Sequence, residues 1–134
     1  MRLLLILAGL GQLVLALGSL AIPRVLNWRA DTAKLRNLTR QVFWTYAGYI
    51  WATNVCFGLV STLAPGWLLD TAPLARAVSA YIALYWIARI AIQFFYFDRS
   101  DAPPGPLTKL GEVALVALFV YLSLVYGALA LGLR

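Results

Sequence analysis

The sequence predicts an all-α membrane protein in which four transmembrane helices form one bundle. Two observations predict this class. Hydrophobic residues make up 63% of the 134 residues and charged residues only 12%, whereas about 25% of the residues of a typical soluble domain are charged. The apolar residues also gather in four runs, residues 3–22, 42–64, 74–97 and 110–133. Each run reaches the roughly 20 residues that a helix needs to cross a bilayer, so we expect residues 1–134 to form a single transmembrane domain.

The first run ends before Pro23, which cannot continue a regular helix. Ser19 and Ala21 would also suit the cleavage site of a secretory signal peptide. Most of the nearby basic residues follow the run, however, and only Arg2 precedes it. This order is the reverse of the charge pattern of a signal peptide. We therefore expect the first run to be retained as a membrane helix.

The connection of residues 23–41 is rich in Lys and Arg and contains a candidate amphipathic helix. Asp31 can cap a helical turn there. One face of this turn is apolar and the remainder is basic, the apolar residues being Leu35, Leu38 and Val42. We expect a short amphipathic helix that lies on the inner membrane surface and leads into the second transmembrane helix. It could recognise an anionic headgroup or a partner, or it could be a solvated loop whose charge only fixes the topology.

Proline and glycine mark the boundaries of the later helices. Pro65 and Gly66 turn the chain after the second run, and Pro73 suits the first turn of the third helix. Residues 103–106 comprise three prolines and one glycine, a composition that predicts a non-helical connection. Thr108 can then cap the fourth helix.

The distribution of Lys and Arg predicts the orientation of the chain in the membrane. Seven of these residues lie in the connections 23–41 and 98–109, and three lie on the other side, namely Arg2, Arg76 and Arg134. Because basic loops stay in the cytoplasm, we expect both termini on the non-cytoplasmic side of the plasma (inner) membrane. Membrane lipids are the expected partners of this charge. Nucleic acid is not expected, because no nucleic-acid-binding motif surrounds the basic residues.

Most residue types that support catalysis or metal binding are absent from the sequence. There is no histidine, and Cys56 is the single cysteine, which excludes imidazole ligation, a histidine base and a redox pair of cysteines. No glycine-rich phosphate loop or nucleophile elbow is present. We therefore expect no metal and no cofactor, and we assign no catalytic residue.

Arg89, inside the third run, marks the candidate site. An arginine at the centre of a membrane helix costs roughly 2.5–3.5 kcal/mol on the insertion scale, so this side chain should face the bundle interior or a polar cavity. It belongs to a stripe whose members recur every four residues and so share one helix face, namely Tyr81, Tyr85, Arg89 and Gln93. Glu112 is its expected partner, in either a structural pair or a functional site, although a carboxylate near a helix start is also favoured by the helix dipole.

Two further residues complete the predicted ligand-binding set of Tyr85, Arg89, Gln93, Glu112, Asn54 and Trp86. Asn54 supplies a polar group on the second helix. Trp86 lies near the middle of the third helix, where its indole N–H needs a partner. It would either fill the bundle interior, as aromatic residues usually do, or form the wall of a pocket for a lipid, a quinone or a pigment.

Isolated polar residues in the other helices are expected to make ordinary interhelical hydrogen bonds, each worth ~0.6–2 kcal/mol. Examples are Gln12 in the first run, Ser61 in the second and Tyr126 in the fourth. The first run also carries small residues, including Gly9 and Gly11. These favour close helix contact, either within the chain or with a membrane-protein partner or a second copy of the chain.

Three classes of function fit these observations. A non-enzymatic accessory subunit or lipid-binding protein is favoured, because the chain has helices and one polar site but no recognisable reaction centre. An oligomeric transporter or channel would need a continuous polar path. An integral membrane enzyme acting on an apolar substrate would use Arg89 to bind an anion, Glu112 as an acid or base and Tyr85 as a proton donor.

Overall fold

The computed structural model describes residues 1–25, 27–96 and 105–132, and over these residues the chain is helical with short connections. Its helices, in chain order, are α1 (Arg2–Ser19), α2 (Ile22–Val25), α3 (Trp28–Ala33), α4 (Asn37–Leu63), α5 (Pro65–Leu69), α6 (Pro73–Phe95) and α7 (Pro106–Ala130). The described residues contain no strand. The all-α class predicted from the sequence is therefore confirmed.

Three helical stretches are long and apolar enough to cross a membrane, namely Arg2–Arg24, Pro73–Phe95 and Lys109–Ala130. They correspond to the first, third and fourth apolar runs of the sequence. α4 is longer, with 27 residues, but it is not among the three. Polar and aromatic side chains such as Tyr46, Tyr49 and Asn54 lower its hydropathy. Length and hydropathy in the described residues thus indicate a membrane-embedded protein with three candidate spanning helices.

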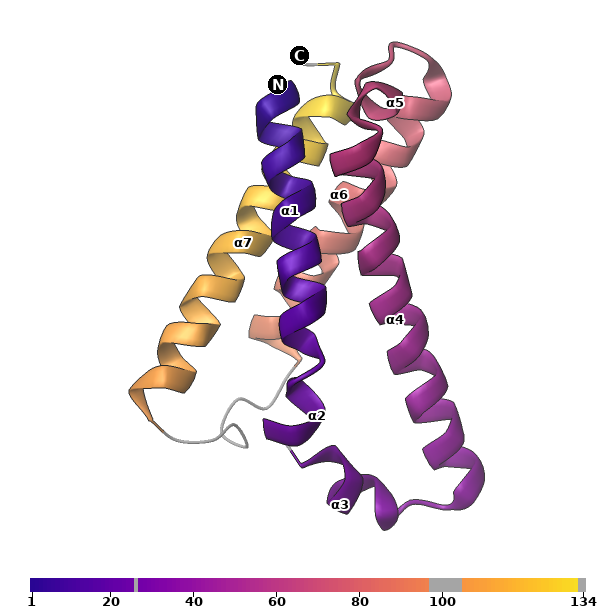
Figure 1. Cartoon of the computed structure of the whole chain (residues 1–134), viewed down its shortest axis with the longest axis vertical. Helices are drawn as coiled ribbons and strands as arrows, with labels where there is room; N and C mark the ends of the chain where they lie inside the picture. The colour runs from indigo at the N-terminus through magenta and orange to yellow at the C-terminus, as the bar shows by residue number, and fades with distance from the viewer. Residues whose placement is uncertain (26, 97–104, 133–134) are drawn as a thin grey trace.

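The four long helices pack as two antiparallel pairs (Figure 1). α1 runs beside α4, and α6 runs beside α7. α1 also contacts α7, and α5 contacts α1, α4 and α6 at the end of the molecule where α1 begins and α7 ends. α2 and α3 lie at the opposite end. The two pairs are thus joined mainly through α1, α5 and α7.

Glycine allows a close crossing of α1 and α4. A Cβ atom added to Gly9 would lie 2.9 Å from the carbonyl oxygen of Gly58, and one added to Gly58 would lie 3.0 Å from the carbonyl oxygen of Gly9. On α1, a Cβ atom added to Gly11 would lie 2.8 Å from the side chain of Leu118 on α7. Small residues let helix backbones approach this closely. These glycines of the first run therefore serve contacts within the chain.

The segment between α1 and α4 differs from the prediction. The expected amphipathic helix is interrupted, because α3 ends at Ala33 and α4 begins at Asn37. Asp31 lies within the first turn of α3 instead of capping it, and Leu35 lies between the two helices. The physical reason is the reversal of the chain between antiparallel α1 and α4. Arg36 contributes to this reversal with an extended backbone (φ −60°, ψ 151°), which cannot continue a helix.

α7 begins earlier than predicted. Gly105 precedes the helix and Pro106 is its first residue, so the assignment of Pro106 to a non-helical connection was wrong. Proline suits this position because an N–H group there would lack a partner within the helix. Thr108 consequently lies inside α7 and does not cap it. The predicted helix ends at residues 97 and 133, and the connection 98–104, lie outside the described residues.

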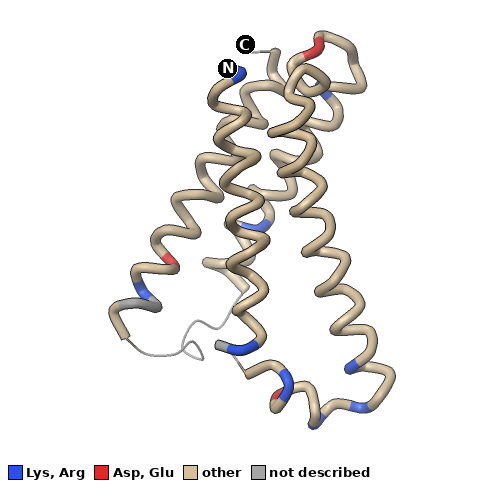
Figure 2. The backbone as a smooth tube through the Cα atoms, in the orientation of Figure 1, with Lys and Arg blue, Asp and Glu red and all other residues tan. Residues whose placement is uncertain are grey.

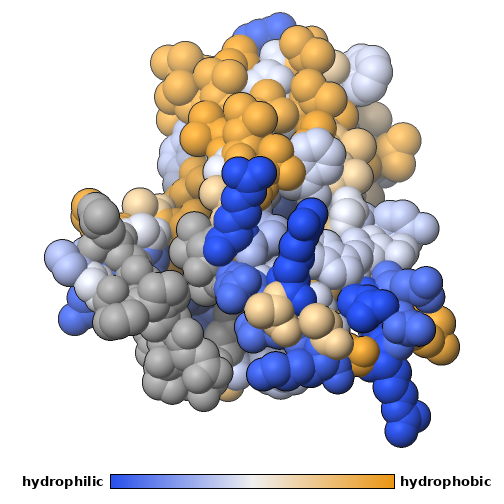
Figure 3. Space-filling view, turned by 60° about the horizontal axis from the view of Figure 1, so that its bottom comes forward, coloured by the Kyte–Doolittle hydropathy of each residue, from blue (hydrophilic) through white to orange (hydrophobic). Residues whose placement is uncertain are grey.

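Charged and apolar side chains occupy different parts of the molecular surface. Lys and Arg gather at the end formed by α2, α3 and the start of α4 (Figure 2). Figure 3 brings this end forward and shows hydrophobic side chains covering the part of the molecule behind it. Large apolar residues of the long helices are exposed, such as Leu17, Leu84 and Leu124. This surface matches a helical protein whose sides contact lipid and whose basic end contacts water or headgroups.

Candidate functional site

Each of the four long helices contributes one side chain to a buried polar cluster. Its members, called here the central cluster, are Gln12 of α1, Ser61 of α4, Trp86 of α6 and Tyr126 of α7, and none is more than 1% exposed. Gln12 Nε2 donates to the Tyr126 hydroxyl at 2.6 Å, and Trp86 Nε1 donates to Gln12 Oε1 at 3.2 Å. The hydroxyl of Tyr126 also shares a hydrogen bond with that of Ser61.

The central cluster supplies hydrogen-bond partners to polar groups that would be unfavourable to bury alone. The indole N–H can only donate, so in an apolar interior it needs an acceptor. Gln12 Oε1 provides this acceptor, and Gln12 Nε2 also lies 3.3 Å from the carbonyl oxygen of Ala8 in its own helix. Leu5, Leu122 and other apolar residues of the same core are fully buried. The cluster therefore connects the helices from inside the apolar core.

Tyr85 and Asn54, two residues predicted for the site, meet between α6 and α4. The Tyr85 hydroxyl donates to Asn54 Oδ1 at 2.9 Å. The Tyr85 ring also packs edge-on against Phe57, with centroids 5.4 Å apart, and against Trp86, with centroids 5.0 Å apart. These long side chains link the two helix pairs where the backbones of α4 and α6 make few close approaches.

Phe119 of α7 connects the central cluster with Arg89. Its ring stacks on Trp86 with centroids 5.2 Å apart and an interplanar angle of 19°. The guanidinium carbon of Arg89 lies 5.1 Å from the centroid of the same ring. A cation over an aromatic ring gains about 0.5–2 kcal/mol, which offsets part of the unfavourable placement of a charge among apolar side chains. Sequence reasoning missed Phe119, because a phenylalanine in an apolar helix carries no functional signal of its own.

Gln93 links Arg89 to Glu112. Arg89 Nη1 donates to Gln93 Oε1 at 3.1 Å, and Gln93 Nε2 donates to Glu112 Oε2 at 2.8 Å. Arg89 and Gln93 are four residues apart on α6 and so share a face, while Glu112 reaches them from α7. Arg89 and Glu112 also take part in further interactions. We call Arg89, Gln93 and Glu112 the polar chain, in which an amide joins the cation to the carboxylate.

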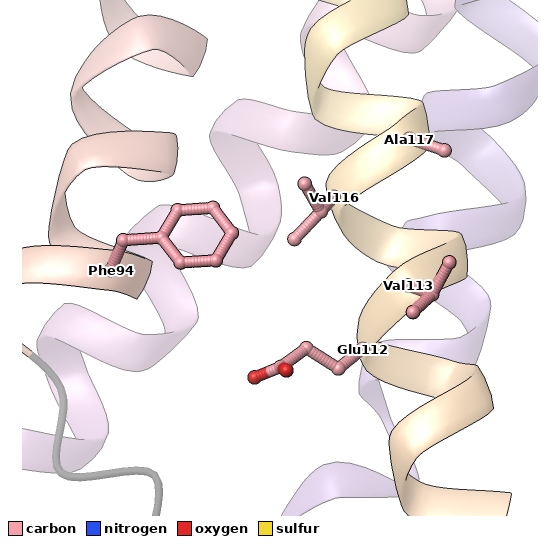
Figure 4. A pocket seen from close by; sticks show the side chains of 5 residues that line it. All are labelled: Phe94, Glu112, Val113, Val116 and Ala117. Carbon is pink, nitrogen blue, oxygen red and sulfur yellow. The ribbon is translucent and has the colours of Figure 1, made fainter.

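A groove lies beside the polar chain, between α6 and α7 (Figure 4). It has a volume of about 320 Å³ and is lined by Phe94, Glu112, Val113, Val116 and Ala117. In Figure 4 the Phe94 ring and the Val116 side chain face each other across the groove, and the Glu112 carboxylate extends toward the α6 side. The walls are apolar except for this carboxylate. An apolar chain with a polar end matches such a lining.

The residues predicted for the site thus divide among three groups, namely the polar chain, the Tyr85–Asn54 pair and, through Trp86, the central cluster. Trp86 and Phe119 are the side chains that connect these groups. Sequence reasoning treated Gln12, Ser61 and Tyr126 as separate interhelical hydrogen bonds and did not bring them together. The available signal was Gln12 itself, the one strongly polar side chain within the first apolar run.

The described residues bring together no group of three or more His, Cys, Asp or Glu side chains that could hold a metal ion. Comparison of the chain with protein-family models, with curated proteins and with solved structures finds no match in any of the three. Function is therefore inferred from the groove and the side chains around it.

Proposed function

We propose that this chain is a non-enzymatic, lipid-binding integral membrane protein whose groove between α6 and α7 holds one amphiphile. The polar end of the amphiphile binds at Glu112, and its apolar chain lies along Phe94, Val113 and Val116. The observation that carries this proposal is the combination of one carboxylate with apolar walls in a single groove. Lipids are the amphiphiles that surround any membrane helix, which makes them the first candidates.

In this proposal α4 is a fourth membrane-crossing helix. Its 27 residues correspond to about 40 Å at a rise of 1.5 Å per residue, more than the ~30 Å hydrocarbon core. α4 lies beside antiparallel α1 and reaches both ends of the molecule (Figure 1). The basic end faces the cytoplasm of a plasma (inner) membrane, so both termini lie on the non-cytoplasmic side.

The chemistry of Glu112 indicates which polar end the groove prefers. An ionised carboxylate only accepts hydrogen bonds, so the ligand needs N–H or O–H donors at its polar end. An ethanolamine headgroup has N–H donors, whereas a choline headgroup has none. Arg89, linked through Gln93, offsets the negative charge of Glu112. We therefore expect the groove to prefer phosphatidylethanolamine to phosphatidylcholine with the same acyl chains.

Photocrosslinking tests the proposal. The protein is reconstituted with phosphatidylethanolamine that carries a diazirine in its acyl chain, and the crosslinked residues are mapped by mass spectrometry. We expect crosslinks to concentrate at Phe94, Val113 and Val116, and to fall several-fold when unlabelled phosphatidylethanolamine is added. The same amount of phosphatidylcholine should compete less well.

Three variants sharpen this test. Val116→Trp fills the groove and should remove the concentrated crosslinks, whereas Val120→Trp places the same ring on an exposed position of α7 outside the groove lining and should leave them. Glu112→Gln should weaken the preference for ethanolamine over choline. Crosslinks spread evenly over all exposed helix faces, in the parent protein and both tryptophan variants alike, would contradict a specific groove.

A further inference from the structure

We propose a second, separate lipid contact, in which the corner between α3 and α4 binds anionic phospholipids of the adjacent leaflet. Five basic residues gather at this end of the molecule (Figure 2) and form what we call the basic corner, namely Arg24, Arg29, Lys34, Arg36 and Arg40. Asp31 is the one acidic residue in the same segment of the sequence. The proposal rests on insertion of the bundle into a membrane, and it depends on neither the groove nor its ligand.

An aromatic contact fixes the position of α3 in the basic corner. The Trp28 ring packs edge-on against Phe43 and Trp44 of α4, with centroids 5.1 Å and 5.9 Å apart. Phe43 and Trp44 also pack edge-on against each other at 5.6 Å. Three mutually contacting rings hold the start of α3 against the second turn of α4. The basic side chains on the two helices are therefore presented together.

Hydrogen bonds and burial orient the charged faces of the two helices. Thr32 is 5% exposed, and its hydroxyl donates to the carbonyl oxygen of Trp28 at 2.7 Å. The Thr32 side of α3 thus faces inward, while Arg29 and Lys34 are exposed. On α4, Arg40 Nη2 donates to Asn37 Oδ1 at 2.8 Å. This bond keeps the Arg40 guanidinium close to the first turn of α4.

The length of α4 places the basic corner at headgroup depth. Its 27 residues exceed the roughly 20 residues that cross the hydrocarbon core, so about two turns extend into the interfacial layer. Basic residues gather at the first turns of α4, which contain Arg40 and Trp44, so these are the turns that we place in the interfacial layer. Tryptophan is favoured at this boundary, and lipid phosphates lie at the same level.

Apolar side chains among the charges favour a lipid partner over a soluble one. Leu38 is 72% exposed, and Leu35 and Val42 are each 39% exposed. Figure 3 shows apolar atoms among the hydrophilic ones at this end. An acidic protein or a nucleic acid could pair with the basic residues but would leave the apolar ones in water. Anionic phospholipids match both, because the phosphate pairs with Arg and Lys and the acyl region covers the apolar side chains.

Native mass spectrometry in a mild detergent tests the proposal. Dioleoyl phosphatidylglycerol and dioleoyl phosphatidylcholine are titrated separately, so that the acyl chains are the same and only the headgroup charge differs. We expect the parent protein to bind the anionic lipid at least about tenfold more tightly. Each basic residue near an anionic surface contributes a factor of up to about five, so Arg29→Gln combined with Arg36→Gln should lower this preference by up to about 25-fold.

Matched variants control for charge and for stability. Arg2→Gln combined with Arg76→Gln removes the same charge at the opposite end and should leave the preference unchanged. Trp28→Ala keeps every charge but releases α3, and should lower the preference several-fold. Because each variant is compared with its own binding of phosphatidylcholine, a loss of stability does not imitate the effect. Val116→Trp, which fills the groove, should also leave the preference intact.

Three results would overturn the proposal. The first is equal binding of the two lipids by the parent protein. The second is an equal loss of preference in the variants at the two ends. The third is full competition by soluble glycerol phosphate at the concentration of the lipid, which would assign the site to a free phosphate ester instead of a membrane lipid.

Discussion

Replacing Gln12 with leucine should destabilise the protein, although leucine is the more apolar residue. The change removes the bond to Tyr126 and leaves the Trp86 N–H without its acceptor, and both partners are at most 1% exposed. A buried polar group left without a partner costs about 1–3 kcal/mol, and interhelical hydrogen bonds in membrane proteins average about 0.6 kcal/mol. We expect a loss of about 1–3 kcal/mol, or roughly 3–9 °C in Tm for a chain of this size.

Thermal unfolding in mild detergent, followed by circular dichroism at the helix band, measures this loss. The exposed glutamine Gln41, changed to leucine, is the matched control and should shift the free energy of unfolding by less than about 0.5 kcal/mol. In a double-mutant cycle, Gln12→Leu and Tyr126→Phe should couple by at least about 0.5 kcal/mol, because contacting residues are not independent. If Gln12→Leu is as stable as the parent protein, the central cluster makes no net contribution and the reasoning fails.

Three further predictions concern helix contacts, the polar chain and orientation. Gly9→Ala should lower stability by about 1–3 kcal/mol through overpacking, since its Cβ would lie 2.7–2.9 Å from α4 atoms. Gly18→Ala is the control and should not lower stability, because nothing lies within 4 Å of its Cβ among the described contacts. Equal unfolding temperatures of the two variants would exclude the close crossing of α1 and α4. Arg89→Leu and Glu112→Leu should each lower the free energy of unfolding by up to about 3–5 kcal/mol, and the double variant should recover much of this loss. Additive losses would show that Arg89 and Glu112 are not energetically coupled through the polar chain. With the native cysteine replaced, Asn37→Cys should be protected from an impermeant thiol reagent in intact cells, and labelling there would reverse the proposed topology.

The helical class and the approximate positions of the long helices could be predicted because they depend on local sequence properties. An apolar run predicts where one helix lies, and prolines such as Pro23 and Pro73 predict where one helix ends or begins. Composition likewise predicts a membrane protein without reference to packing. α4 shows the limit of this approach, since its apolar run is long enough to span but its tyrosines and Asn54 lower the hydropathy on which the assignment depends.

The connections among the polar residues could not be predicted, because they depend on where helices cross. Gln12 lies near the middle of α1, whereas Ser61 and Tyr126 lie within the last turns of α4 and α7. Counting residues from the helix ends would place these side chains at different depths. They meet because the helices differ in length, tilt and contact point. The break at Arg36 is similar, since the chain reversal that requires it is a property of the packed pair.

The amide of Gln12 also gives the interior of the bundle a handedness. The amide nitrogen donates to the carbonyl oxygen of Ala8 and to the Tyr126 hydroxyl of α7, so the amide oxygen is left to accept from the donor-only indole of Trp86 on α6. If α6 and α7 exchanged places around α1, the Trp86 N–H would face the amide nitrogen of Gln12, and two donors would meet. If the amide rotated to avoid this, its oxygen would face the carbonyl oxygen of Ala8, and two acceptors would meet. Either mismatch costs about 1–3 kcal/mol in the buried core. One side chain thus distinguishes the native order of helices from its mirror arrangement, which apolar packing between similar helices discriminates only weakly.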